Sequence, residues 1–297
     1  MSLVRLPYSA ILAKLRAFQS YLAGLGLRRG PHRLQQLVDC VDVCEKARQK
    51  GQLGFLQQRP DVDDLVWSLV EGTEFARIYE GLRGYDPTVI RGLMQKALRG
   101  PLHPNLEAPH NSSNTARNTT FELRLGAGLR ARGAEVILGD QADLVVDYAG
   151  ARVFIECKRP FSHHTVRKHV REARRQLKRR LDADPHSVKA GIVAISISKA
   201  ANPGSHLFVA RNWHALQDLS NDIISLHQQH SADYDRLVDL RLIGILYHLF
   251  TPAYVESDHL LTAAAQTVAF FSGPAVQTML PISGQPLESL LYDALQS

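Results

Sequence analysis

Residues 152–160, Arg-Val-Phe-Ile-Glu-Cys-Lys-Arg-Pro, predict a short apolar strand that ends in a pair of opposite charges. Strand side chains alternate between two faces, so Glu156 and Lys158 share one face. The other face carries side chains that predict contact with a hydrophobic core, namely Val153, Ile155 and Cys157. The charge pair is either a salt bridge at the edge of a sheet or part of a chemical site.

A second short strand precedes this one. Residues 142–148, Ala-Asp-Leu-Val-Val-Asp-Tyr, have β-branched residues at their centre, and Ala-Gly at 149–150 supplies a turn, so 142–157 predicts a β-hairpin. If the acidic faces of the two strands match, Asp143 or Asp147 comes close to Glu156. Converging carboxylates repel each other unless a cation lies between them, and hard divalent cations such as Mg²⁺ and Mn²⁺ prefer oxygen ligands of this kind.

A third acidic residue, Glu122, lies upstream in the segment 118–125. Its apolar spacing fits both a helix and a strand, and Gly126 and Gly128 weaken a helix by roughly 1 kcal/mol each. We favour a helix. Glu122 also has a purely structural interpretation, because Thr119-x-x-Glu122 fits a capping box at a helix start.

The ordered set of Glu122, Asp143 and Glu156-Cys-Lys158 resembles the PD-(D/E)XK nuclease superfamily. The resemblance covers about residues 115–200. It implies a restriction-endonuclease-like fold, that is, an α/β protein with an α-β-β-β-α-β core and a mixed central sheet, here preceded by an α-helical N-terminal region.

The sequence differs from the pattern of that family in two respects. Ala142 stands where the family often has proline before the Asp, and Asp140 and Asp147 are alternatives to Asp143.

The resemblance also implies roles for these residues. Asp143 and Glu156 would bind Mg²⁺ or Mn²⁺ together with the backbone carbonyl of Cys157, and Glu122 would contact the ion directly or through water. Lys158 would orient a water molecule whose pKa the ion lowers, and it would stabilise negative charge on the phosphate.

The expected activity is that of a metal-dependent nuclease that hydrolyses phosphodiester bonds, with DNA favoured over RNA, in restriction, repair or phage defence. The alternative is a catalytically silent nucleic-acid-binding or regulatory protein that retains a nuclease fold. A helical scaffold with an accidental motif is a third interpretation.

A strongly basic segment follows the motif strand. Residues 158–180 contain ten Lys or Arg and one acidic residue, Glu172, whereas the segment from 181 onward is acidic. An apolar stripe at helical spacing predicts that one face of this helix is buried, and the stripe consists of Val166, Val170, Ala173, Leu177 and Leu181. One sign of charge on the remaining faces favours binding to a phosphate backbone.

Most of the expected nucleic-acid contacts lie on this helix. The set is Arg159, Arg167, Lys168, Arg171, Arg174, Arg175 and Lys178, together with Gln176, which the resemblance suggests for positioning the substrate. Phosphate contacts of this kind position a substrate without reading its sequence.

The chain divides into three parts by its pattern of turns and apolar residues. Residues 1–99 predict an α-helical N-terminal region, 100–117 a turn-rich linker, and 118–297 a nuclease-like domain. The expected helices are 8–25, 32–50, 61–82, 87–98 and about 212–230. Strands are expected at 190–197 and 241–249, with one further element at 260–271. The N-terminal region could mediate homodimer formation or bind a protein partner.

Composition limits the protein class. No apolar run approaches the ~18 residues of a membrane span, and the three cysteines predict structural thiols in a reducing cytoplasm. Residues 1–33 are rich in Lys and Arg, as transit segments are. The periodic spacing of the apolar residues in the same segment favours a helix that belongs to the fold.

Overall fold

The computed structural model describes most of the 297-residue chain. The described residues are 7–27, 32–56, 58–107, 115–139, 142–148, 150–229, 241–258, 260–271 and 287–296.

The first part of the chain is helical, as predicted. It contains α1 (Tyr8–Gly24), α2 (His32–Gln49), the short α3 (Leu53–Leu56), α4 (Val62–Leu82), α5 (Pro87–Ala97) and one 3-10 turn, η1 (Pro104–Leu106). The α5 helix begins as its sequence indicates, because Pro87 stands at the first turn and the Asp86 carboxylate accepts a hydrogen bond from the Thr88 N–H at 2.8 Å.

The remaining part alternates strands and helices. In chain order these are α6 (Thr115–Ala131), β1 (Glu135–Leu138), β2 (Leu144–Tyr148), β3 (Ala151–Lys158), α7 (His163–Ala183), β4 (Lys189–Ser196), α8 (Ser198–Ala201), β5 (Phe208–Ala210), α9 (Trp213–Gln229), β6 (Leu242–Val255), η4 (Glu256–Asp258), β7 (Leu260–Phe271) and α11 (Leu287–Gln296). The predicted hairpin and the predicted strands and helices of this part are therefore present, and the strand expected at 241–249 extends to Val255.

The strands form one mixed sheet. Within the described residues it has seven strands in the order β1-β2-β3-β4-β6-β5, with β7 also paired to β6. The strands β1, β2 and β3 are antiparallel neighbours, whereas β3, β4 and β6 run parallel. The carboxyl ends of the three parallel strands therefore lie at one end of the sheet, which is where open α/β sheets bind ligands.

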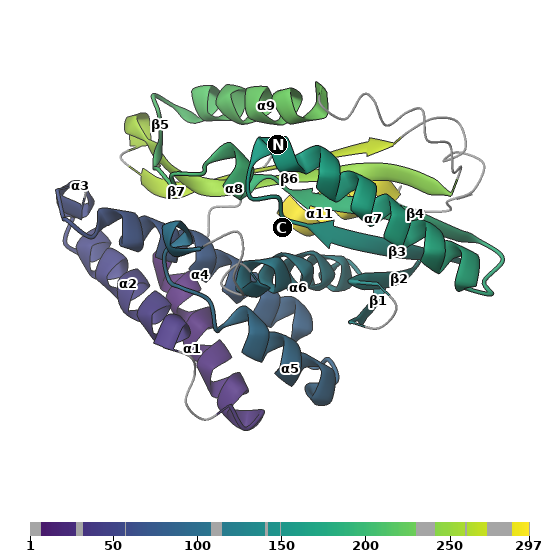
Figure 1. Ribbon diagram of the computed structural model, residues 1–297. Coiled ribbons are helices and arrows are strands. Elements are labelled where there is room, and N and C mark those ends of the chain that lie inside the picture. Colours follow the sequence, from purple (N-terminus) through teal and green to yellow (C-terminus); the bar gives the residue numbers. More distant parts are fainter. Residues whose placement is uncertain are drawn as a thin grey trace.

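Helices cover both faces of the sheet (Figure 1). The apolar stripe of α7 is buried, as predicted, and it packs with Val145, Phe154 and Val193 on one face. Val153 and Ile155 point to the other face and share a core with α6 and the N-terminal helices. Because β3 has a core on each side, its charged residues enter a buried environment.

The helix α6 resolves the ambiguity between helix and strand, and its glycines allow close packing. A Cβ at Gly128 would collide with the backbone of Ala294 in α11, and one at Gly126 would meet the side chains of Leu138 and Leu144. The glycines thus weaken the isolated helix but permit contacts that a larger residue would block.

The predicted linker does not coincide with a break in the core. Helices α1 to α5 belong to the same hydrophobic cluster as α6 and β3, and α4 approaches α6 so closely that a Cβ at Gly81 would meet the Ala127 carbonyl. Helix α6 begins at Thr115, three residues before the predicted boundary, while 108–114 lie outside the described residues.

Among the helices that the structure describes, none combines the length and the apolar character needed to cross a membrane. All three cysteines are free thiols.

Candidate functional site at the end of β2 and β3

The hairpin register brings Asp143 beside the motif strand. Leu144 pairs with Ile155 in the antiparallel ladder, so Asp143, one residue earlier, stands level with Glu156. Its carboxylate Oδ2 accepts a hydrogen bond from the Cys157 N–H at 2.7 Å. The side chain of Asp143 thus replaces a backbone partner at the end of the ladder and is held against the motif strand.

Asp147, the alternative carboxylate, is placed elsewhere. It lies opposite Arg152 in the ladder and accepts two hydrogen bonds from its guanidinium, at 2.9 and 2.8 Å. This bidentate pair occupies Asp147 at the far end of the hairpin. The other alternative, Asp140, lies outside the described residues.

Glu156 and Lys158 form a buried ion pair. The Lys158 Nζ lies 3.2 Å from Glu156 Oε2 and 4.0 Å from Asp143 Oδ2. Glu156 is 1% exposed and β3 lies between β2 and β4, so the pair is a salt bridge, but it is buried and not at an edge of the sheet. Two carboxylates and one ammonium therefore converge where β2 begins and β3 ends.

Arg180 is a further partner of Glu156 that the sequence analysis did not select. It comes from the last turns of α7, and its Nη2 lies 2.8 Å from Glu156 Oε1. Glu156 Oε1 has no hydrogen-bond partner in the described part of the chain, so its contact with Arg180 is an ion pair whose angles do not fit a hydrogen bond. The sequence shows Arg180 only as the last basic residue of segment 158–180, and no local pattern indicates which carboxylate it contacts.

Glu122 lies inside α6 and not at its start. The helix begins at Thr115, and the Thr119 hydroxyl donates to the Thr115 carbonyl at 3.0 Å, so the capping-box interpretation is wrong. Within the described residues, Glu122 has no hydrogen bond and no ion pair. Its carboxylate is therefore free for another partner.

Burial and neighbouring carboxylates raise the pKa of two carboxyl groups of the site, those of Glu122 and Glu156. Burial and then the charge of Asp143 raise the pKa of Glu122 to about 8, and Glu156 adds to the effect. Burial and Asp143 also raise the pKa of Glu156, while Lys158 and Arg180 oppose this. The site therefore holds more negative charge than its buried surroundings favour, which a cation or a proton would relieve.

The donor set matches a hard divalent cation in its chemistry, since it consists of carboxylate oxygens and the carbonyl of Cys157. Its arrangement is less complete. In the part of the chain that the structure describes, no three acidic, His or Cys side chains lie close enough to hold an ion, and both oxygens of Glu156 contact cationic side chains.

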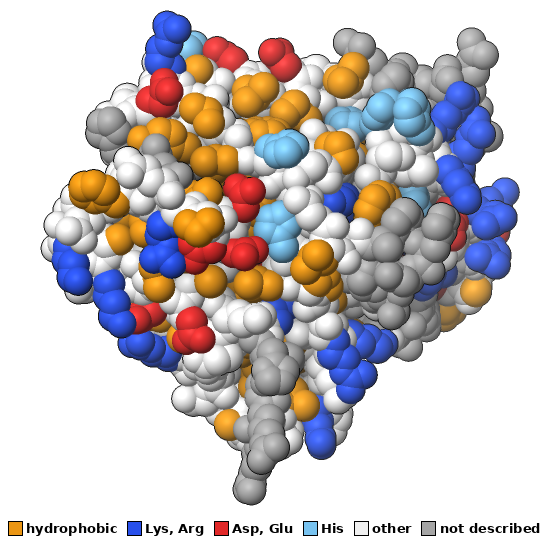
Figure 2. All heavy atoms as spheres, turned by 60° about the vertical axis from the view of Figure 1, so that its left-hand side comes forward, with side chains coloured by type: hydrophobic (Ala, Val, Ile, Leu, Met, Phe, Trp, Pro, Cys, Tyr) orange, Lys and Arg blue, Asp and Glu red, His pale blue; other side chains and the backbone are white. Residues whose placement is uncertain are grey.

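The basic residues of α7 divide between surface and interior. The exposed ones are Arg167, Lys168, Arg171, Arg175, Lys178 and Arg179, while Arg174 is half-buried. Figure 2 shows a group of Lys and Arg side chains along the right-hand edge of the molecule, with others at the left and at the bottom of the view. The exposed side chains of α7 are therefore mostly basic.

Gln176 lies on the half-buried side of α7, and its amide oxygen has no hydrogen-bond partner in the described part of the chain. Arg180 follows it by four residues on the same face of the helix, so Gln176 lies near the face that meets Glu156. Its placement is compatible with a positioning role.

Arg159 is placed differently from the expectation. Its side chain is 8% exposed, and Nη1 donates to Glu107 Oε2 at 2.9 Å. It alternates away from Lys158 and enters the layer of the N-terminal helices, so it does not belong to the exposed basic face of α7.

Arg159 belongs to a buried ion-pair network that the sequence did not reveal. Glu107 also pairs with Arg117 of α6, Arg117 pairs with Glu71 of α4, and Glu71 pairs with Arg33 of α2. These partners are separated by many residues in the chain, so no local pattern could connect them.

Comparison with known proteins gave no relative: no family model, no curated protein and no solved structure matches this chain.

Proposed function

We propose that this protein is a metal-dependent nuclease that hydrolyses phosphodiester bonds in nucleic acid, with DNA as the favoured substrate. The observation that carries the proposal is the convergence of Asp143, Glu156 and Lys158 at the end of β2 and β3, with the unpaired carboxylate of Glu122 nearby. Carboxylates that repel one another beside a buried lysine fit a site completed by a cation and a phosphate.

The order of elements supports the proposal. Helix α6, strands β1, β2 and β3, helix α7 and strand β4 follow one another in the α-β-β-β-α-β order expected for the restriction-endonuclease-like core. The three carboxylates and the lysine come from the elements on which that core would carry them.

The acidic residues of the site would bind the metal ion, and the basic residues would contact the phosphate. Asp143, Glu156 and the Cys157 carbonyl would hold Mg²⁺ or Mn²⁺, with Glu122 beside them, and the ion would supply an acidified water molecule and neutralise charge on the phosphate. Lys158 would leave its contact with Glu156 to donate to that water and to the phosphate. The exposed residues of α7 would hold flanking phosphates.

A non-catalytic nucleic-acid-binding protein is the second candidate. It is favoured by one observation, namely that Glu156 is already neutralised by Lys158 and Arg180. Such a protein would bind nucleic acid through α7, with affinity that falls steeply with salt and needs no divalent ion.

The test is cleavage of plasmid and single-stranded DNA in Mg²⁺ or Mn²⁺ by the wild type, Lys158→Met and Asp143→Asn. We expect each variant to lose about 10²–10³-fold of the activity, because each removes a group that acts on the developing charge. Lys50→Ala is the matched control, since Lys50 is exposed and distant from the site.

Calorimetric titration with Mn²⁺ separates the two candidates. The nuclease requires saturable binding by the wild type that Asp143→Asn weakens at least about tenfold. Equal binding by both proteins, or cleavage that survives in Lys158→Met, would rule out the assignment of this site.

A further inference from the structure

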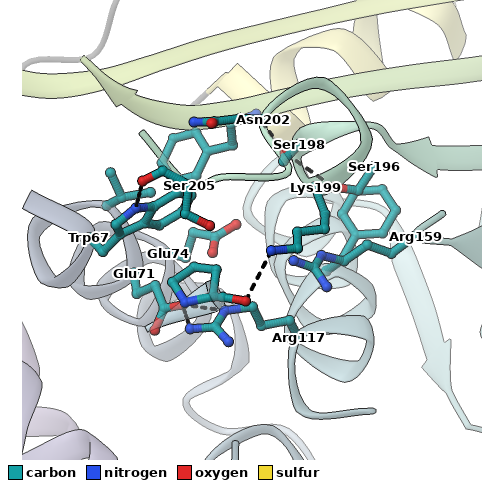
Figure 3. A pocket seen from close by; sticks show the side chains of 14 residues that line it. Trp67, Glu71, Glu74, Arg117, Arg159, Ser196, Ser198, Lys199, Asn202 and Ser205 are labelled. Carbon is teal, nitrogen blue, oxygen red and sulfur yellow. Dashed lines mark hydrogen bonds and ion pairs between the residues drawn. The ribbon is translucent and has the colours of Figure 1, made fainter. Parts of the chain in front are cut away.

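A second polar site lies at the same end of the sheet, on the side of the N-terminal helices (Figure 3). It is a pocket between α4, α6, α8 and the carboxyl ends of β3 and β4, with a cavity volume of about 40 Å³. A cavity of this size has room for roughly three water molecules, which is the volume of a small polyatomic ion. Arg159, the residue after Lys158, lines it.

The charged side chains around this pocket carry more positive than negative charge. The cations are Arg33, Arg117, Arg159 and Lys199, and the carboxylates are Glu71, Glu107 and Glu74. Glu71 and Glu107 are each shared between two arginines. Buried charge without a counter-charge is costly, so the excess favours an anion.

Lys199 points into this space with an incomplete set of partners. It is 4% exposed, and its ammonium donates to the carbonyls of Pro104 at 3.1 Å and Pro203 at 2.9 Å. An ammonium has three N–H groups. Within the described residues the third has no hydrogen-bond acceptor, although the Phe161 ring centroid lies 5.1 Å from Nζ.

Ser205 supplies a buried hydroxyl that has no partner. It is 1% exposed, it lines the pocket, and its Oγ makes no hydrogen bond in the part of the chain that the structure describes. Its backbone is held at a φ of 55° while its carbonyl accepts from Trp67 Nε1 at 2.7 Å. A non-glycine residue at positive φ is strained, so the surroundings hold the backbone of Ser205 in this conformation against its preference.

We propose that this pocket binds a small oxyanion, a phosphate group or an ion of similar size, between Lys199, Arg159 and the Ser205 hydroxyl. The anion satisfies the free N–H of Lys199 and the free hydroxyl of Ser205, and it balances the excess positive charge. Glu74 lines the same space without a hydrogen bond or ion pair among the described residues, and it faces the anion as a protonated carboxyl. Burial and the charge of Glu71 raise its pKa to about 7, in keeping with this role.

The protein carries its own optical probe for this site. Trp67 lines the pocket, and the chain has one other tryptophan, Trp213. In a Trp213→Phe background, Trp67 fluorescence is titrated with sodium phosphate and with sodium sulfate at constant ionic strength maintained by chloride. We expect a saturable change with both oxyanions and none on chloride exchange alone.

Two variants that keep the fold give opposite expectations. Ser205→Ala removes a hydroxyl that has no partner, so it leaves stability unchanged but weakens the binding of the anion about tenfold or more. Glu74→Gln removes a negative charge from the pocket and strengthens binding above the pKa of Glu74. Lys50→Met, at an exposed residue that belongs to neither proposed site, is the control and leaves the titration unchanged.

The absence of a saturable signal, or equal affinity in the wild type, Ser205→Ala and Glu74→Gln, overturns the proposal. Neither the fluorescence titration of the wild type nor its comparison with the two variants needs a divalent ion. Failure of the nuclease assignment therefore does not affect either measurement.

A further comparison tests whether the anion is free or belongs to a nucleic-acid strand. The binding of a 5′-phosphorylated oligodeoxynucleotide is compared with that of its 5′-hydroxyl counterpart. If the phosphorylated strand binds more tightly than both free phosphate and the hydroxyl strand, the pocket receives a strand end, a result that rests on the proposed function. If the two strands behave alike while free phosphate binds, the ligand is a free anion.

Discussion

At the scale of single residues, the site is defined by carboxylates in an unfavourable environment. Glu156 is almost fully buried and depends on Lys158 and Arg180 for neutralisation, whereas Glu122 has no such partner. A buried carboxylate without a partner takes up a proton or a cation. The energetic strain of this site is therefore concentrated on Glu122.

The substitution Glu122→Gln should stabilise the metal-free protein at high pH. The pKa of Glu122 rises from 4.5 to about 8 on folding, so the folded state holds this proton more tightly than the unfolded chain. The resulting stabilisation is fully present below about pH 4.5 and is lost as the pH rises through about 8. After allowance for partial exposure, we expect Glu122→Gln to be more stable than the wild type by about 1–3 kcal/mol above pH 8 and equal to it near pH 4.

The measurement is urea unfolding in the presence of a chelator across this pH range. Glu135→Gln is the control, because Glu135 is exposed on β1, and it should follow the wild type. Parallel pH curves for the wild type and Glu122→Gln would mean that the carboxylate is not strained.

At the scale of elements, close helix contacts explain residues that propensity alone disfavours. Gly81 in α4 and Gly128 in α6 lie where neighbouring backbones leave no room for a side chain. Gly92, in contrast, stands on the open surface of α5, with no atom within 4 Å of a Cβ built there. The same residue type thus has opposite consequences in different helices.

We expect Gly81→Ala and Gly92→Ala to change stability in opposite directions. Gly81→Ala pushes α4 away from Ala127 and should destabilise the protein by about 1–3 kcal/mol, the usual range for overpacking. Gly92→Ala should stabilise it by about 0.5–1 kcal/mol through helix propensity. Thermal and urea unfolding of both variants measure this, and a stabilising Gly81→Ala would show that α4 and α6 are not in close contact.

At the scale of the whole molecule, buried charges connect the helical region to the sheet. The network runs from Arg33 through Glu71, Arg117 and Glu107 to Arg159, the residue that follows Lys158. It joins helices of the first hundred residues to the end of β3 across a shared hydrophobic cluster. The N-terminal helices therefore contribute directly to the environment of the site.

Removal of the central carboxylate should be among the most damaging single changes. Glu71→Gln leaves Arg33 and Arg117 without their shared counter-charge in the interior, and we expect a loss of about 3–5 kcal/mol. Asp42→Asn breaks the more exposed pairs with Arg16 and Lys46 and should cost no more than about 1 kcal/mol. Urea unfolding compares the two, and similar losses would indicate that the network does not couple the layers.

Much of the architecture could be predicted because it depends on local spacing. The alternation of 152–158, the hairpin with 142–148 and the apolar stripe of α7 each follow from the period of one element. The start of α6 at Thr115 was predicted less accurately, because Gly126 and Gly128 weaken the helical pattern of this segment. These glycines are explained by tertiary contacts with β1, β2 and α11, which leave no room for a larger side chain.

The sequence by itself determined that Glu156 and Lys158 share a face at the end of an apolar strand, since side chains of a strand alternate whatever surrounds it. Only the tertiary structure decided between Asp143 and Asp147, because strand register sets which carboxylate stands level with Glu156. The tertiary structure also turned Arg159 inward to Glu107, because a partner fifty-two positions away depends on how distant layers pack and not on any local pattern.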